Sequence, residues 1–399
     1  MDAAGSLKTR AGRQAWHGAR RILAVRLDNL GDVLMTSPAL RALRQGAPGR
    51  TITLLAAGSG AAAAARVPEV DAVLELACPW MPGEAPLPDD LWEAMLQIRA
   101  RAFDAAVIFT AYSQSPLPAA LLCWQAGIPL RLAHCRENPY HLLSDWIADP
   151  EPHELLRHEV RRQLDLVGSV GCFADDERLS FRVEEGDVEA AMRHLRDAGV
   201  EPLLPRVVVH PGASAESRRY PVERFGDALQ LFLEARAAMQ RQDELQVVLT
   251  GSAEEAPLCE ALRERLGGIC KTVSLAGQLG LGELGAVLAP AALLIANNTG
   301  PVHIAAALGT PVVDVYALTN PQHAPWQVPH RVLTHDVPCR FCYRSVCPQG
   351  HHDCLRLLDP ARIAEAARLL LEEGADRAVA PAPLPHTHVV ARLAPAEDG

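Results

Sequence analysis

The chain is poor in lysine. Only Lys8 and Lys271 occur among its 399 residues, and arginine supplies the other positive side chains. Any contact with a phosphate must therefore come from arginine, a backbone N–H group or the start of a helix. The formal net charge is −10. Nucleic-acid-binding proteins depend on a basic surface for affinity, so this charge argues against that class and we expect no nucleic-acid partner.

Long apolar runs are also missing. No stretch approaches the roughly 20 apolar residues that a membrane-spanning helix needs. The first twenty residues, MDAAGSLKTRAGRQAWHGAR, lack the apolar core of a signal peptide. We therefore expect a cytoplasmic protein in which residues 1–20 form a flexible basic leader. The leader could touch an anionic membrane surface, but a disordered segment is the simpler interpretation, and residues 376–399, rich in Ala and Pro, are expected to be a disordered tail.

The pattern of apolar residues predicts the fold class. Short apolar runs typical of buried parallel strands alternate with helix-periodic segments, and this alternation occurs twice along the chain. We predict an α/β protein with two tandem Rossmann-like domains, residues 21–175 and 200–358, and a closing helix at 359–375. Neither domain carries the G-x-G-x-x-G fingerprint of NAD-binding proteins. The expected strands are 21–28, 51–56, 72–76, 105–109 and 130–133, and then 206–210, 246–250, 273–275, 293–296 and 312–316.

Residues 293–316, LLIANNTGPVHIAAALGTPVVDVY, form the most informative stretch. An apolar strand is followed by polar residues, a short helix that Pro301 can begin and Gly309 can end, and a second strand. The free N–H groups at the helix start offer hydrogen-bond donors and partial positive charge to an anion. The alternative is an ordinary strand–helix turn in which Asn298 or Thr299 only caps the helix.

Polar residues follow three expected strands of the second domain. They are Ser214 with Arg218, Glu255, and the group Asn298, Thr299 and Gly300. An arginine can clamp a diphosphate, a helix start adds backbone donors, and a glutamate can accept hydrogen bonds from ribose hydroxyls. Together they predict a nucleotide site.

The first domain offers a single carboxylate, Asp32, at its first strand-to-helix turn. The helix start stabilises such a carboxylate as an anion, so it could take a proton from an attacking hydroxyl. The alternative is that Asp32 only caps its helix.

Three motifs resemble those of glycosyltransferase family 9, the heptosyltransferases that build the inner core of lipopolysaccharide. The first is GDVL followed by TSPAL at residues 31–40, which contains Asp32. The second is HPGAS at 210–214 with Arg218 and Tyr220-Pro221. The third is NTGPVH at 298–303 followed by AAALGTP at 305–311. GIPLR at 127–131 and a late cysteine cluster are most similar to the heptosyltransferase II type.

The resemblance implies a glycosyltransferase B-type fold, in which the C-terminal domain holds ADP-heptose and the N-terminal domain receives the acceptor. The acceptor would be a lipid-linked saccharide at the inner face of the inner membrane, and neither metal nor cofactor is expected. Asp32 would be the general base of an inverting transfer, with Asn29 and Gly31 beside it on the acceptor side. The alternatives are another sugar moved to another cell-surface glycan, or a nucleotide-sugar epimerase of the same fold.

The same resemblance assigns residues to the donor. Ser214, Arg218 and the helix start at Thr299 and Gly300 would stabilise the departing diphosphate, and Glu255 would hold the ribose. Asn298 would face the sugar or its phosphates, and His303 would support that turn.

The sequence departs from the family pattern at three positions. Many members have Asp where Asn298 stands, many have Lys where Arg218 stands, and the usual Phe-Gly is here Tyr316-Ala317. The first and last changes bear on which sugar is bound.

Ten cysteines do not make a disulfide scaffold at this length. Six are scattered, and four form a C-x2-C-x4-C-x6-C cluster. The cluster could bind a structural zinc ion, although its spacing matches no strong zinc signature. The alternative is a loop of reduced thiols packed under the final helix. The cluster consists of Cys339, Cys342, Cys347 and Cys354, with His351 and His352 among them.

Overall fold

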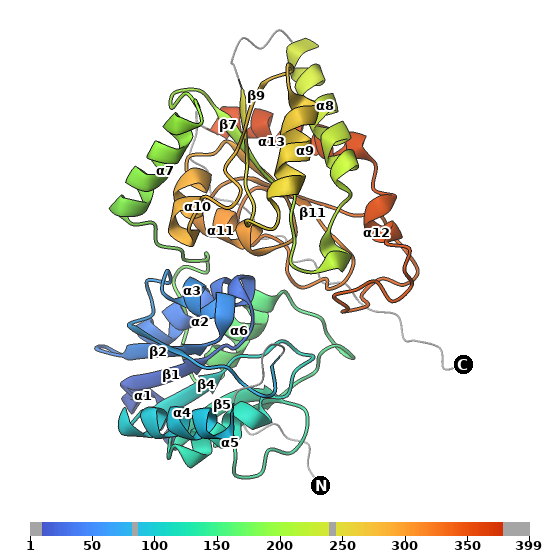
Figure 1. Cartoon of the computed structure of the whole chain (residues 1–399). Helices are drawn as coiled ribbons and strands as arrows, with labels where there is room; N and C mark the ends of the chain where they lie inside the picture. Colours follow the sequence, from blue (N-terminus) through green and yellow to red (C-terminus); the bar gives the residue numbers. More distant parts are fainter. Residues whose placement is uncertain (1–9, 82–86, 239–244, 378–399) are drawn as a thin grey trace. The chain divides into compact units, whose positions relative to one another are not determined.

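The computed structural model describes residues 10–81, 87–238 and 245–377. The chain divides into two compact units, and the division falls between Ser180 and Phe181. Each unit is an α/β layer structure around one six-stranded parallel sheet (Figure 1). The predicted α/β class with two tandem Rossmann-like domains is therefore confirmed. None of the helices in the described ranges is both long and apolar enough to cross a membrane.

Unit 1 has the strand order β3-β2-β1-β4-β5-β6. The order reverses between β1 and β4, and this is the point where open α/β sheets usually bind ligands, beyond the carboxyl ends of the strands. The strands are β1 (Arg21–Val25), β2 (Thr51–Ala56), β3 (Ala72–Glu75), β4 (Ala105–Ile108), β5 (Leu130–Cys135) and β6 (Asp145–Ala148). The helices are α1 (Arg10–Gly18), α2 (Leu30–Gln45), α3 (Gly58–Ala64), α4 (Pro88–Ala100), α5 (Leu117–Gln125) and α6 (Glu159–Gly168).

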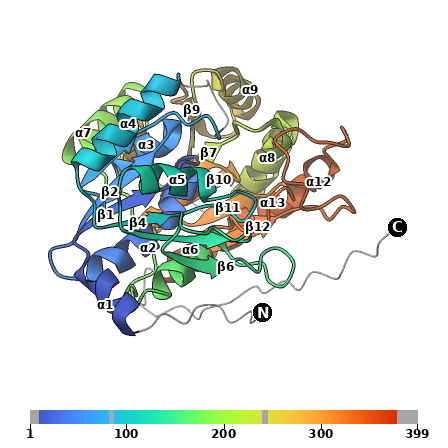
Figure 2. The same ribbon diagram turned by 90° about the horizontal axis from the view of Figure 1, so that it is seen from below.

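The helices of unit 1 cover both faces of its sheet, as the view from below in Figure 2 also shows. Helix α2 packs between α3 and α6, while α4 and α5 pack on the strand residues Leu23 and Val25. Helix α2 continues through Pro38, which lacks the N–H that would normally bind the Leu34 carbonyl. The Ser37 hydroxyl donates to that carbonyl at 2.6 Å, which replaces the missing donor.

The prediction of a flexible leader over residues 1–20 is wrong for its second half, because residues 10–18 form α1. Trp16 explains the difference. Its side chain is fully buried, and its indole N–H donates to Asp145 at 2.8 Å. One buried aromatic residue thus fixes a segment whose composition alone suggested a tail. Residues 1–9 and the expected tail from 378 onward lie outside the described ranges.

Unit 2 repeats the architecture with the strand order β12-β11-β10-β7-β8-β9. Helices α8, α9 and α13 pack together on one face, and α7, α10 and α11 lie on the other (Figure 1). The strands are β7 (Arg206–His210), β8 (Gln246–Leu249), β9 (Lys271–Ser274), β10 (Leu293–Asn297), β11 (Val312–Val315) and β12 (His330–Leu333). The helices are α7 (Glu185–Asp197), the 3-10 turn η1 (Glu216–Arg218), α8 (Val222–Ala238), α9 (Ala256–Leu266), α10 (Leu281–Leu288), α11 (Gly300–Leu308), α12 (Asp353–Arg356) and α13 (Pro360–Arg377).

Strands β8, β7, β10 and β11 are neighbours in this sheet, so their carboxyl ends form one continuous edge. This edge carries all three polar groups that the sequence places after strands of the second domain. Helix α11 ends as expected at Gly309, whose φ of 80° is a left-handed conformation that glycine adopts without strain.

Candidate active site

The start of α11 lies directly after β10 and has no side-chain cap. Thr299 is the N-cap residue, but its hydroxyl donates to the Asn297 carbonyl at 3.2 Å instead of accepting a bond from the first turn. The side chain of Asn298 is also directed elsewhere. The interpretation that these two residues only cap the helix is therefore wrong.

Pro301 has no N–H, and the Val302 N–H donates to the Thr299 carbonyl at 3.1 Å. Among the first three residues of the helix, the Gly300 N–H is therefore the one left without a partner in the described ranges. His303 is buried in the same turn region.

Asn297, for which the sequence predicts no role, joins β10 to the loop after β7. Its amide nitrogen donates to the carbonyls of Pro211 at 2.7 Å and Gly212 at 3.3 Å, and its Oδ1 accepts from the Tyr220 backbone at 3.1 Å. The side chain is fully buried. These bonds hold the loop that carries Ser214 and Arg218 beside the start of α11.

Glu255 lies against the same loop. A Cβ atom at Gly212 would stand 2.0 Å from Glu255 Oε1, so only glycine permits this close approach. Glu255 Oε2 accepts from the Ser252 backbone at 2.8 Å and lies 3.7 Å from His210 Nε2. Burial lowers the pKa of His210, while Glu255 acts in the other direction. The structure thus brings the predicted ribose-binding glutamate to the predicted phosphate-binding loop.

Arg218 is half-buried at the end of η1, and Ser214 before it is exposed. Within the described ranges, the Arg218 guanidinium makes no hydrogen bond or ion pair of its own. The turn that carries it is nevertheless fixed, because Ser217 donates from its backbone to the Ser345 carbonyl at 3.0 Å and from its hydroxyl to the Arg344 carbonyl at 2.7 Å. A positioned arginine with open donors is suited to an anionic ligand.

In unit 1, Asp32 belongs to a buried charge cluster that forms where β1 ends. Fully buried Arg26 pairs with Asp28 at 2.8 Å, Asp32 at 3.2 Å and Glu159 at 2.8 Å. Burial opposes the charge of Arg26, but the three carboxylates outweigh it and raise the pKa of the guanidinium. The Asp32 side chain keeps 16% exposure, whereas Glu159 has none. Asp32 is therefore held in place by an ion pair, and the view that it only caps α2 is incomplete.

Asp28 completes this cluster. It accepts a hydrogen bond from Gln114 at 2.5 Å, and burial raises its pKa despite the opposing effect of Arg26. Asn29 is the exposed N-cap residue of α2, and Gly31 lies in its first turn. The predicted acceptor-side residues thus flank Asp32 in space as well as in sequence. The cluster partners were missed, because Glu159 lies 133 residues from Arg26 and no local pattern links the two.

A second polar network borders the ends of β4, β5 and β6. Arg162 binds Asp149 and Glu151, at 2.7 and 2.5 Å, and it holds the pKa of Asp149 low although burial acts the other way. Burial, with the charges of Arg162 and Arg157, lowers the pKa of His134 to about 3. A polar pocket of about 150 Å³ lies at these strand ends. It is lined by Ser113, Gln114, Ser115, Pro116, His134, Cys135, Arg136, Glu137 and Asp149.

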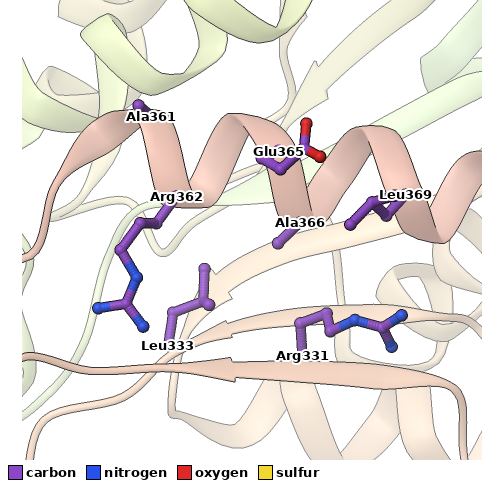
Figure 3. Close-up of a pocket in the computed structure, with 7 residues that line it drawn as sticks. All are labelled: Arg331, Leu333, Ala361, Arg362, Glu365, Ala366 and Leu369. Carbon is purple, nitrogen blue, oxygen red and sulfur yellow. The ribbon is translucent and has the colours of Figure 1, made fainter.

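A larger hollow of about 400 Å³ lies away from the strand ends, between α13 and the edge strand β12 (Figure 3). Its centre is apolar, with Leu333, Ala366 and Leu369. Arg362 beside it donates to the Thr334 carbonyl at 2.9 Å. No residue predicted for the site lines this hollow, so it is separate from the candidate active site.

Of the four clustered cysteines, Cys339, Cys342 and Cys347 lie in the loop between β12 and α12, and Cys354 lies in α12. Cys339 Sγ lies 3.5 Å from His351 Nε2, and burial together with the other three thiols raises the pKa of Cys354. Among the residues that the structure describes, no three His, Cys, Asp or Glu side chains are arranged to hold one metal ion. Both interpretations of the cluster, a structural zinc site and a loop of reduced thiols, remain untested.

Comparisons with known proteins agree with the motifs. Residues 92–352 match the family described as Glycosyltransferase family 9 (heptosyltransferase). The chain is 26% identical over 375 residues to lipopolysaccharide heptosyltransferase 2 of Escherichia coli K12, a match that covers 89% of this chain and 100% of the relative.

Solved structures share the fold. A glycosyl transferase family 9 protein of Veillonella parvula matches with a TM-score of 0.73 at 22% identity, covering 89% of this chain and 98% of that one. The E. coli ADP-heptose lps heptosyltransferase II matches with a TM-score of 0.67 at 22% identity, covering 89% and 99%. Because the family match spans more than half of the chain, the protein belongs to glycosyltransferase family 9 and is a glycosyltransferase with the GT-B fold.

Proposed function

We propose that this glycosyltransferase moves a heptose from ADP-heptose to the inner core of lipopolysaccharide, with inversion at the anomeric carbon and without a metal ion. The names of the relatives support the donor and the acceptor. The observation that carries the proposal is the strand-end edge of unit 2, where the uncapped start of α11, fixed Arg218 and Glu255 meet. This edge offers donors to a diphosphate and an acceptor to a ribose.

The chemistry is a single displacement. The oxygen of an acceptor hydroxyl attacks the anomeric carbon as the bond from that carbon to the diphosphate oxygen breaks, so the configuration inverts. The hydroxyl proton passes to the Asp32 carboxylate, which acts as general base. Arg26 supports this role because its guanidinium, 3.2 Å from Asp32 Oδ1, favours the anionic form that a base requires.

The departing ADP gains negative charge in the transition state. Arg218, the Ser214 hydroxyl and the Gly300 N–H at the start of α11 would stabilise that charge, which is the task a divalent cation performs in other transferases. Glu255 would accept hydrogen bonds from the ribose, and His303 would support the α11 turn. The acceptor would reach unit 1 as a lipid-linked saccharide, with the enzyme in the cytoplasm at the inner face of the inner membrane.

The test is transfer by the purified protein, followed by mass spectrometry, with ADP-heptose and a truncated lipid-A core. D32A and D32N should lower the transfer rate by roughly 10²–10⁴-fold, the usual contribution of a general base. Both should bind ADP-heptose as the unaltered protein does. D89A is the matched control, because Asp89 is also in the first turn of a helix, α4, and is exposed.

Full transfer by D32A would contradict the assignment of the base. A panel of ADP- and UDP-sugars tests the donor separately. If another sugar is transferred faster than heptose, that sugar is the donor and the heptose proposal is wrong. Conversion of the nucleotide sugar in the absence of an acceptor would indicate an epimerase.

A further inference from the structure

Asp314 is a fully buried carboxylate close to the proposed donor site. It is the third residue of β11 and pairs in register with Ala296 of β10. Its Oδ2 accepts a hydrogen bond from Asn298 Nδ2 at 2.9 Å. Its Oδ1 is buried and has no hydrogen-bond partner among the described residues. A buried acid that is only half satisfied is costly, so a fold that keeps it there calls for an explanation.

The partner of Asp314 is the residue before the start of α11. Asn298 Nδ2 donates both to Asp314 Oδ2 and to the His323 carbonyl, each at 2.9 Å. Both N–H groups of the amide therefore donate to buried acceptors. Because the amide is planar, its Oδ1 must point away from Asp314 and His323. Asn298 retains 5% exposure, and no described residue donates to its Oδ1.

This arrangement selects one of the two orientations of the amide. Turned over, the amide would set its oxygen against two acceptors, Asp314 Oδ2 and the His323 carbonyl, although its two ends have nearly the same shape. Removing Asp314 leaves only the His323 carbonyl to oppose that orientation. With Asp314 in place, only the oxygen faces outward. The site then presents a neutral acceptor beside the open Gly300 N–H of α11.

The electrostatics explain why a neutral acceptor is useful here. A carboxylate at position 298 would add a negative charge next to a diphosphate that already carries several. The amide oxygen can still accept a hydrogen bond from a sugar hydroxyl without that repulsion. The acidic group instead lies one strand away and is shielded from solvent. Burial raises the pKa of Asp314 well above its usual range, and the Asn298 hydrogen bond and the charge of Arg218 act in the other direction. Buried Tyr316 lies within the electrostatic influence of Asp314.

The geometry points to Asp314 as a positioning residue that turns the carbonyl oxygen of Asn298 toward a hydroxyl of the donor sugar. This inference rests on the proposed nucleotide-sugar site and adds a determinant of sugar specificity to it. Asp314 itself touches neither substrate nor product. Its main effect is expected on the sugar half of the donor, because its hydrogen bond goes to Asn298, whereas the diphosphate would be held by Arg218 and the start of α11.

The experiment compares the affinities for ADP and ADP-heptose by calorimetry. D314L removes the acceptor for Asn298 Nδ2 and should weaken ADP-heptose binding about tenfold, the value of one lost hydrogen bond of ordinary strength. ADP binding should change less than twofold. D314N keeps an acceptor oxygen opposite Asn298, so it should retain the ratio of the two affinities found in the unaltered protein.

The control is T310V. Thr310 is also buried, and it donates to the Leu288 carbonyl at 2.9 Å just before β11 begins, so the variant loses a buried hydrogen bond without reaching Asn298. It should leave the ratio unchanged. The inference is overturned if D314L keeps the ratio of the unaltered protein, or if D314N loses it as D314L does. An unaltered protein that binds ADP-heptose no better than ADP would overturn this inference and the proposed donor together.

Discussion

Removing the charge of Arg26 gives the sharpest test of the cluster that holds Asp32. In R26M a flexible apolar side chain replaces a guanidinium that is buried among three carboxylates, all within 3.2 Å. Breaking a buried ion pair by removing one partner typically costs about 3–5 kcal/mol, because the remaining charge is left without compensation. That is a large part of the roughly 5–15 kcal/mol that stabilises a typical domain.

Two companion variants set the scale of this effect. E159Q removes one of the negative charges but keeps an oxygen opposite Arg26, so we expect a loss of about 1–2 kcal/mol, the value of weakening a charged hydrogen bond. R44M removes Arg44 from its pair with Asp71, in which the side chains are 37% and 40% exposed. Exposed pairs contribute at most about 1 kcal/mol, so R44M is the matched arginine control.

Urea unfolding followed by tryptophan fluorescence measures the free energy of unfolding of unit 1 in each variant. Five of the six tryptophans lie in unit 1, and only Trp326 lies in unit 2. The pH dependence of transfer gives a second readout. The acid limb should move to higher pH in R26M, since Asp32 loses its neighbouring cation, and to lower pH in E159Q, since it loses a neighbouring anion. Equal stability of R26M and R44M, or shifts of the same sign in both cluster variants, would refute this account of Asp32.

Two further predictions concern titratable groups outside the proposed mechanism. The pKa of His134 is lowered to about 3, so in the pH range from about 6.5 to 3 the unfolded chain binds a proton that the folded chain does not. The free energy of unfolding should therefore fall by slightly over 1 kcal/mol for each pH unit as the pH drops through this range. In urea titrations, H134Q should make the dependence of that free energy on pH less steep by the same amount. The same pH dependence in H134Q and the unaltered protein would contradict the prediction. Backbone N–H groups of residues 349–352 lower the pKa of Cys347 although desolvation acts the other way, while burial raises the pKa of Cys123 to about 12. Peptide mass spectrometry should thus show that iodoacetamide at pH 7 alkylates Cys347 first and leaves Cys123 intact. One bound zinc ion per chain, with Cys347 protected from the reagent, would instead support the structural zinc interpretation of the cluster.

The sequence predicted the two sheets well because the central strands of a parallel sheet are nearly continuous apolar runs. Strands such as Leu293–Asn297 are buried along their whole length. Of the four edge strands, β3 and β9 were predicted, whereas β6 and β12 were not. The unpredicted strands read DWIA and HRVL. The first alternates between partly buried and exposed positions and the second has a single buried residue, Leu333, so both lack the continuous apolar signal of the interior strands. Edge strands commonly carry such polar side chains because these discourage pairing with other chains.

In the site, too, the residues that a local sequence pattern marks could be predicted, and those whose role depends on distant partners could not. Arg218, Glu255 and Thr299 could be predicted because each follows its own strand, and neighbouring parallel strands bring their carboxyl ends to one edge. Asn297 was missed although it lies beside two predicted residues, because its role is to bind the Pro211 and Gly212 carbonyls, which a linear pattern does not reveal. The sequence therefore predicts which residues reach the edge and leaves open how they are oriented there.

The charge state of the motif residues depends on partners from outside the motifs. Asp32 is next to Arg26 in space, and the buried charge of Arg26 is compensated by three carboxylates, one of which, Glu159, is 133 positions away. Asn298 presents its oxygen because its nitrogen donates to Asp314, 16 positions away on the next strand, and to the His323 carbonyl. Replacing Asn298 by the aspartate common in the family would set two carboxyl groups within hydrogen-bond distance, and one of them would have to take up a proton. Asn298 can therefore be exchanged for its family counterpart without this cost only when its buried partner, Asp314, is exchanged with it.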